Sequence, residues 1–137
     1  MRRDEPVAQV ASCRVLVVDD DPIVAAGTVA MLEDLGHEAQ EANSGDAALR
    51  LLRADPAVDL VITDHAMPGM TGTELAVRIR HAWPGLPIVI ATGYAELPTE
   101  GDLKLPRLSK PYRQHELAAM VARIVTPQTK PQRAVVG

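Results

Sequence analysis

Aromatic residues are nearly absent from this chain of 137 residues, which has one tryptophan, two tyrosines and no phenylalanine. Its core must therefore be built from aliphatic side chains. The 47% hydrophobic composition supplies enough of them for one domain with a sizeable core. Because this length leaves no room for a second folded module, we expect partners to complete the function.

Cysteine, excess positive charge and long apolar runs are also missing. The single cysteine, Cys13, has no partner for an internal disulfide, and a net charge of −4 gives no electrostatic reason to expect nucleic-acid binding. No stretch reaches the ~18 apolar residues of a membrane span, and none follows a charged start as in a signal peptide. These absences favour a cytoplasmic protein whose partners include neither membrane nor nucleic acid.

Short apolar runs alternate with helical patterns five times along the chain. Runs of β-branched residues without polar alternation are typical of strands buried on both faces of a parallel sheet. The pattern therefore predicts an α/β fold with helices on both faces of the sheet. The expected strands are 14–18, 37–41 (a polar edge), 59–63, 87–91 and 105–109. We expect a domain over residues 13–125 between mobile segments, 1–12 and 126–137.

The expected helices are less uniform than the strands. Their starts are predicted near Pro22, at Ser44, at Thr71 or Thr73, and near Arg113. In the first of them, apolar spacing predicts that four residues face the core: Ile23, Ala26, Ala30 and Met31. A further helix, over 94–104, is expected to be short or irregular because proline and glycine interrupt it.

Four of the apolar runs end in side chains that phosphoryl chemistry can use. These are Asp19, Asp20 and Asp21 after the first run, then Asp64, Thr92 and Lys110 after the later ones. Because ligands of open parallel sheets bind beyond the carboxyl ends of the strands, we expect these groups to converge. Gathered carboxylates repel one another unless they share a cation, and their oxygens favour Mg2+. Asp21, next to a proline, is expected to cap a helix instead.

The segments VLVVDDDP, DLVITDHAMPGMTG, IVIATGYAE and LSKPY together resemble the receiver domain of two-component response regulators, the CheY-like superfamily. The resemblance covers residues 14 to about 125 and implies a flavodoxin-like doubly wound (βα)5 fold, with strand order 2-1-3-4-5. It implies a signalling protein, not an enzyme, which takes a phosphoryl group from a sensor histidine kinase or a histidine phosphotransfer protein. Its output would be a conformational change that a downstream protein target detects, without a DNA-binding output domain.

By motif position, the resemblance makes Asp64 the phosphoacceptor and makes Asp19 and Asp20 the acidic pair that holds Mg2+. Asp64 and the backbone carbonyl of Ala66 would complete the protein ligands of the metal. These assignments agree with the chemistry of the residues, because a carboxylate is a sufficient nucleophile when nearby positive charge stabilises the transferring phosphoryl group.

The resemblance makes Thr92 the switch hydroxyl and Lys110 the lysine that contacts the phosphoryl oxygens, in a Lys-Pro peptide bond that is commonly cis in the family. The chain departs from the usual pattern three residues before Lys110, where Arg107 replaces an aromatic switch residue. Tyr94 or Tyr112 could take over part of that role. The TGY string and the broken fourth helix are similar to receivers of hybrid kinases and of stand-alone regulators, and the two tails favour a stand-alone regulator.

Two other classes of protein share part of this pattern. Asp19 and Asp21 have the D-x-D spacing of haloacid-dehalogenase-type phosphohydrolases, but Pro22 is unexpected there and no late acidic pair follows Lys110. Cobalamin-binding domains use a D-x-H-x-x-G loop, whose spacing this chain does not match because its histidine directly follows Asp64.

Overall fold

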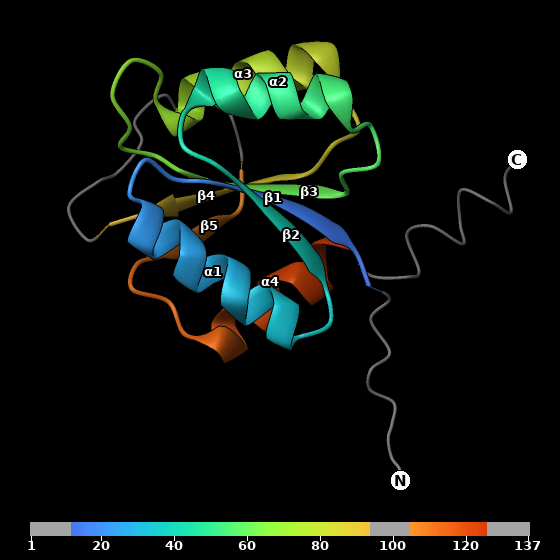
Figure 1. Cartoon of the computed structure of the whole chain (residues 1–137), viewed down its shortest axis with the longest axis vertical. Helices are drawn as coiled ribbons and strands as arrows, with labels where there is room; N and C mark the ends of the chain where they lie inside the picture. Colours follow the sequence, from blue (N-terminus) through green and yellow to red (C-terminus); the bar gives the residue numbers. More distant parts are fainter. Residues whose placement is uncertain (1–11, 94–104, 126–137) are drawn as a thin grey trace, which may run out of the picture.

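Five parallel strands form one sheet in the order β2-β1-β3-β4-β5, with helices on both of its faces (Figure 1). The computed structural model describes residues 12–93 and 105–125. The strands are β1 (Arg14–Val18), β2 (Glu38–Ala42), β3 (Leu60–Asp64), β4 (Ile88–Thr92) and β5 (Arg107–Ser109). The helices within the described ranges are α1 (Pro22–Asp34), α2 (Gly45–Ala54), α3 (Gly72–Ala82) and α4 (Gln114–Ile124). The predicted fold class and strand order are confirmed.

Some predictions concern residues beyond the described ranges. The helix expected over 94–104 and nearly all of the two terminal segments belong to this group. The helix expected near Arg113 is α4, and the Lys110–Pro111 peptide bond is cis, as the resemblance implied. None of the described helices has the length and hydropathy that a membrane span requires.

The helix starts follow from local hydrogen bonding. The Asp21 carboxylate accepts hydrogen bonds from the backbone N–H groups of Ile23 and Val24, which confirms its predicted role as the cap of α1. Ser44 caps α2 as predicted. For α3, the structure selects Thr71, whose side chain forms a reciprocal capping box with Glu74.

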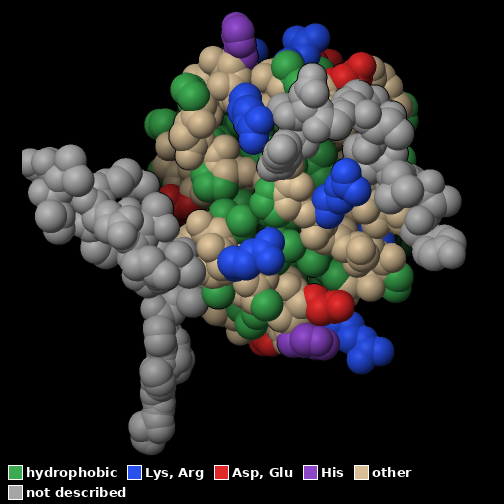
Figure 2. Space-filling model, turned by 180° about the vertical axis from the view of Figure 1, so that it is seen from behind, with side chains coloured by type: hydrophobic (Ala, Val, Ile, Leu, Met, Phe, Trp, Pro, Cys, Tyr) green, Lys and Arg blue, Asp and Glu red, His purple; other side chains and the backbone are tan. Residues whose placement is uncertain are grey.

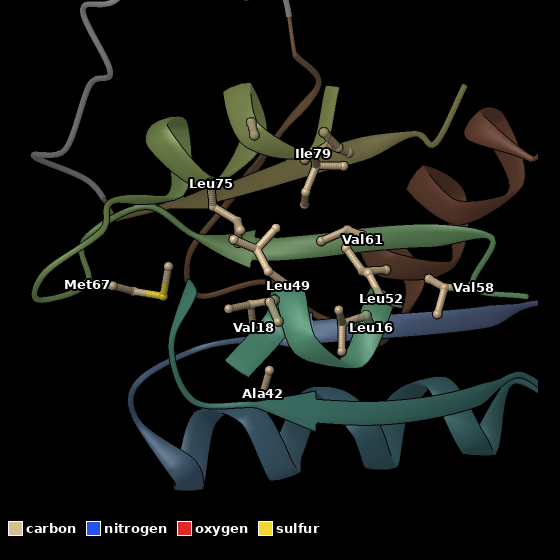
Figure 3. Packing of buried hydrophobic residues seen from close by; sticks show 13 residues of the cluster. Leu16, Val18, Ala42, Leu49, Leu52, Val58, Val61, Met67, Leu75 and Ile79 are labelled. Atoms are coloured by element: carbon tan, nitrogen blue, oxygen red, sulfur yellow. The ribbon is translucent and has the colours of Figure 1, made fainter. Parts of the chain in front are cut away.

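The core on one face of the sheet lies under α2 and α3 (Figure 3). Leu49 and Leu52 of α2 and Leu75 and Ile79 of α3 point toward the strands, where they meet residues such as Val61. Burying a leucine or isoleucine side chain stabilises a fold by about 1.5–3 kcal/mol, so this layer holds the two helices firmly on the sheet. A second core lies on the opposite face, between the sheet, α1 and α4.

The buried face of α1 differs from the predicted one. Ala25, Thr28 and Leu32 are buried, whereas Ile23 leaves 82% of its surface exposed. Of the other three residues expected to face the core, Ala26 and Ala30 are exposed, whereas Met31 is partly buried and packs against the core as predicted. The prediction was wrong for Ile23, Ala26 and Ala30 because α1 carries apolar side chains on all sides, so its periodicity does not distinguish one face.

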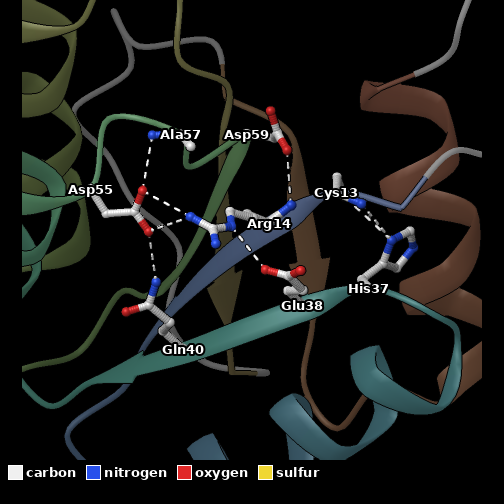
Figure 4. Close-up of polar contacts among 8 residues, drawn as sticks. All are labelled: Cys13, Arg14, His37, Glu38, Gln40, Asp55, Ala57 and Asp59. Atoms are coloured by element: carbon white, nitrogen blue, oxygen red, sulfur yellow. Dashed lines mark hydrogen bonds and ion pairs between the residues drawn. The ribbon is translucent and has the colours of Figure 1, made fainter.

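A polar network lies where the strands begin (Figure 4). The Arg14 guanidinium is 2.9 Å from Oδ2 of Asp55 and 2.8 Å from Oε1 of Glu38, and the Arg14 backbone N–H donates to Asp59. Asp55 also accepts from the backbone N–H of Ala57. The network joins the first residues of β1 and β2 to the loop between α2 and β3.

His37 is buried at the same end of the sheet, where its Nδ1 accepts a hydrogen bond of 3.2 Å from the backbone N–H of Cys13 (Figure 4). Burial lowers the pKa of His37, because the charged imidazolium is disfavoured away from water. The neutral ring is therefore the form that the fold selects.

We expect the folded state to lose stability as the pH falls below about 6.5, the ordinary pKa of histidine. Below that value the unfolded chain binds a proton at His37 that the folded chain does not, which lowers the free energy of unfolding by at most about 1.4 kcal/mol per pH unit. Urea unfolding at several pH values measures this dependence. His37→Gln should flatten it, whereas the exposed His81→Gln should not; equal slopes in all three proteins would contradict the assignment.

Positive charge does not gather on the face shown in Figure 2. The Lys and Arg side chains of the described residues lie apart from one another there, separated by hydrophobic and uncharged surface. The described residues visible on this face therefore form no continuous basic patch.

Candidate functional site

Three carboxylates meet at the carboxyl ends of β1 and β3. Asp19 and Asp20 directly follow β1, Asp64 ends β3, and each offers an oxygen within 4.8 Å of the other two. Asp19 and Asp64 are buried, whereas Asp20 is exposed. Hard oxygen ligands with one side open to solvent suit Mg2+, which retains several waters when it binds. The residues present therefore fit the metal that the sequence predicted.

The strand register brings the other predicted groups to the same edge. Asp64 is paired with Ala91 of β4, and Thr92 is paired with Ser109 of β5. Thr92, which is buried, therefore lies one residue beyond the level of Asp64, and Lys110 follows directly after β5.

Lys110 reaches across the sheet to the acids. Its Nζ lies 2.8 Å from Oδ1 of Asp64 and 3.4 Å from Oδ2 of Asp19, and its backbone N–H donates to the Thr92 carbonyl. Burial by itself would lower the pKa of Lys110, but the hydrogen bond and the negative charge of Asp64, with smaller contributions from Asp19, outweigh burial and raise that pKa above its usual range. A fixed positive charge therefore contacts the predicted phosphoacceptor.

The loop after β3 is held close to the start of α3. The Gly72 N–H donates a 2.9 Å hydrogen bond to the His65 carbonyl, and His65 Nδ1 lies 3.2 Å from the Thr73 hydroxyl. A Cβ at Gly72 would lie only 2.3 Å from the carbonyl oxygen of Asp64. Ala66 is exposed in this loop, and its carbonyl as a metal ligand stays a prediction.

We expect Gly72→Ala to destabilise the fold by about 1–3 kcal/mol, because the added methyl group would push the backbone of Asp64. Chemical denaturation measures the loss. Gly27→Ala is the matched control, since nothing lies within 4 Å of a Cβ there. In the interior of α1 this control should stabilise the protein by about 0.5–1 kcal/mol. An unchanged free energy of unfolding in Gly72→Ala would show that the loop adjusts to the methyl group without loss of stability.

Arg107 and the two tyrosines suggested as its replacement in the switch have different positions in the structure. Arg107 is exposed on β5, and Tyr94 lies outside the described residues. The Tyr112 hydroxyl lies 2.5 Å from Oγ1 of Thr28 in α1. Sequence reasoning missed this contact, because the two residues are 84 positions apart and no motif connects them. It also missed Gly72, whose place directly after a helix cap was the only local signal.

Comparison with known proteins identifies the family. The sequence matches the response regulator receiver domain over residues 15–122. It is 32% identical to the response regulator receiver protein CpdR of Brucella abortus over 116 residues, which are 82% of this chain and 96% of CpdR. It is 34% identical to the sensor kinase CckA of the same organism over 124 residues, covering 85% of this chain but only 13% of the kinase.

Solved structures show the same relationship. The structure of the chemotaxis protein CheY4 of Vibrio cholerae aligns with a TM-score of 0.73 and 28% identity, over 83% of this chain and 99% of CheY4. The matched range, residues 15–122, contains the acids at the ends of β1 and β3, Thr92 and Lys110. This chain belongs to the response regulator receiver domain family of two-component systems.

Proposed function

We propose that this receiver domain is a phosphoacceptor. Asp64 would take a phosphoryl group from the phosphohistidine of a sensor histidine kinase or a histidine phosphotransfer protein. The observation that carries the proposal is the contact of 2.8 Å between Lys110 Nζ and Asp64, in a cluster whose three carboxylates lie within 4.8 Å of one another. Lys110 and Asp64 alone would be an ordinary ion pair. The two further acids, Asp19 and Asp20, support the proposal that the cluster also holds a cation.

In the proposed transfer, a carboxylate oxygen of Asp64 attacks phosphorus while the bond from phosphorus to the donor's imidazole nitrogen breaks. The product is an acyl phosphate on Asp64, and the leaving imidazole takes up a proton as it departs. Lys110 stabilises the charge that spreads over the phosphoryl oxygens. Mg2+, when held by Asp19, Asp20, Asp64 and the Ala66 carbonyl, supplies further positive charge at the same oxygens.

The response to phosphorylation would begin at Thr92 and Lys110. Lys110 now bonds Asp64, so a phosphoryl group on that aspartate would give the ammonium new oxygens to bind, and the buried Thr92 hydroxyl would bind others. Because the Lys110 N–H is bonded to the Thr92 carbonyl, the ends of β4 and β5 would respond together. A downstream protein would detect this change. The protein would act in the cytoplasm, and this chain would signal without catalysing a reaction of its own.

Replacing Asp64 with asparagine should abolish labelling by acetyl phosphate or by a phosphohistidine donor in the presence of Mg2+. Intact-mass spectrometry with peptide mapping measures the adduct, and hydroxylamine should release it because acyl phosphates react with that nucleophile. Asp46→Asn, an exposed acid in the first turn of α2, is the matched control and should be labelled normally.

Two results would contradict the proposal. Full labelling of the Asp64→Asn protein would show that another residue accepts the phosphoryl group. Turnover of a phosphate ester by that variant would instead support a phosphohydrolase that uses Asp19 as its nucleophile.

A further inference from the structure

The segment that carries Lys110 is tied to α1 by two side chains beyond the site. The Tyr112 hydroxyl lies 2.5 Å from the buried hydroxyl of Thr28. Gln114 Nε2 donates hydrogen bonds to the carbonyl of Met31, at 3.1 Å, and to the Asp34 carboxylate, at 2.9 Å. Tyr112 and Gln114, the first residue of α4, therefore anchor the segment after β5 to α1.

The backbone at Lys110 is held in place by two hydrogen bonds, one at Lys110 itself and one at Tyr112. On one side its own N–H is bonded to the Thr92 carbonyl, and on the other Tyr112, two residues later, is bonded to α1. The Lys110 side chain is long and flexible, and its ammonium must reach acids at the carboxyl ends of two other strands. Because the reach of the side chain is limited, the position of the Lys110 backbone affects how often the ammonium lies at hydrogen-bond distance from Asp64.

The Tyr112 ring packs against the core between the sheet, α1 and α4. Burial raises the pKa of Tyr112, the hydrogen bond to Thr28 lowers that pKa by less, and the charges of Lys110, Asp19 and Asp64 make smaller contributions of both signs. Tyr112 is therefore a neutral phenol at ordinary pH. Either hydroxyl can donate the hydrogen bond between Tyr112 and Thr28, so the bond adds no charge next to the carboxylates.

We propose that Tyr112 is a positioning residue, which holds Lys110 against Asp64 through its hydrogen bond to Thr28. This inference rests on the proposed function, because Lys110 acts on the phosphoryl group only in a phosphoacceptor. Without the bond, the segment after β5 keeps the Gln114 hydrogen bonds to α1 but loses the tie that lies nearest to Lys110. The Lys110 ammonium then spends less time in contact with Asp64.

The test removes the hydrogen bond from either side. Tyr112→Phe keeps the aromatic ring but lacks the phenolic hydroxyl. Thr28→Val keeps the branched shape of the side chain but lacks its hydroxyl. Each should slow the labelling of Asp64 by acetyl phosphate at least about fivefold, because small displacements of a positioned group are costly in rate. The double variant should be no slower than the single ones, since both remove the same interaction. Thr28→Ser, which retains the hydroxyl, should stay within about twofold of the parent protein.

A second measurement separates positioning from general stabilisation. The NMR signal of the Lys110 Cε methylene, recorded in the unphosphorylated protein, should shift in Tyr112→Phe and Thr28→Val but not in Thr28→Ser. Parental labelling rates with an unmoved Lys110 signal would overturn the inference. Slower labelling with an unmoved signal, or effects that multiply in the double variant, would also overturn it.

The NMR comparison keeps this inference distinct from the proposed function. If the parent protein is not labelled at all, the proposed function fails, and the Lys110 signal still shows whether Tyr112 sets the lysine position. If Thr28→Val does not fold, the signal and the labelling rate of Tyr112→Phe decide the question.

Discussion

Labelling of Asp64 should slow by at least about a hundredfold when Lys110 is replaced by methionine. Methionine keeps an unbranched side chain of similar length but removes the ammonium that lies 2.8 Å from Asp64 Oδ1. The transferring phosphoryl group then loses a fixed positive charge at its oxygens, and a hundredfold change in rate corresponds to about 2.7 kcal/mol in the barrier. Rates of labelling by acetyl phosphate at saturating Mg2+ measure the effect.

Two further variants define what this result means. Arg107→Ala removes an exposed cation from the first residue of β5, three positions before Lys110, and should leave the labelling rate near that of the parent protein. Thr92→Ala should still be labelled but should show a smaller spectral change on labelling, because it loses the hydroxyl that would bind the new oxygens. Parental kinetics in Lys110→Met would show that the contact with Asp64 is only a structural ion pair.

The second large effect is expected at Asp20. Asp20→Ala should abolish Mg2+-dependent labelling, because it removes the most accessible of the three clustered carboxylates. It should do so without unfolding the protein, since Asp20 is exposed and its removal reduces repulsion among the acids. Thermal unfolding with and without Mg2+ measures both parts: the parent should be stabilised by the metal, by an amount that grows with concentration, and the variant should not.

The neighbouring acids provide the controls. Asp19 accepts hydrogen bonds from the Asp21 N–H and from Lys110, so Asp19→Ala should lower stability as well as labelling, and labelling less completely than Asp20→Ala. Asp21→Ala removes the cap of α1 and should cost about 1 kcal/mol while leaving the response to Mg2+ intact. An unchanged response to Mg2+ in both Asp19→Ala and Asp20→Ala would show that the acidic pair is only a turn.

The sheet and the location of the site could be predicted from the sequence because both depend on short-range patterns. Runs of buried residues such as those of β3 and β4 specify parallel strands, and parallel strands bring their carboxyl ends together. Asp64, Thr92 and Lys110 are thus neighbours in space for the same reason that each follows an apolar run. Caps such as Ser44 were equally local, since the capped N–H groups lie within three residues.

The remaining features depend on packing between distant parts of the chain. The buried side of α1 is chosen by what the sheet and α4 offer, and an evenly apolar helix gives no sign of that choice. The bond between Thr28 and Tyr112 exists only because α1 and the segment after β5 lie side by side. The contact of Gly72 with the backbone of Asp64 similarly required the path of the loop between β3 and α3.

The polar network around Arg14 and the acidic site lie at opposite ends of β1, a strand of five residues that is about 16 Å long. The network and the site share no side chain. Substitutions at Asp55 or Asp59 are therefore expected to raise or lower the melting temperature while leaving the contacts among Lys110, Asp19 and Asp64 unchanged.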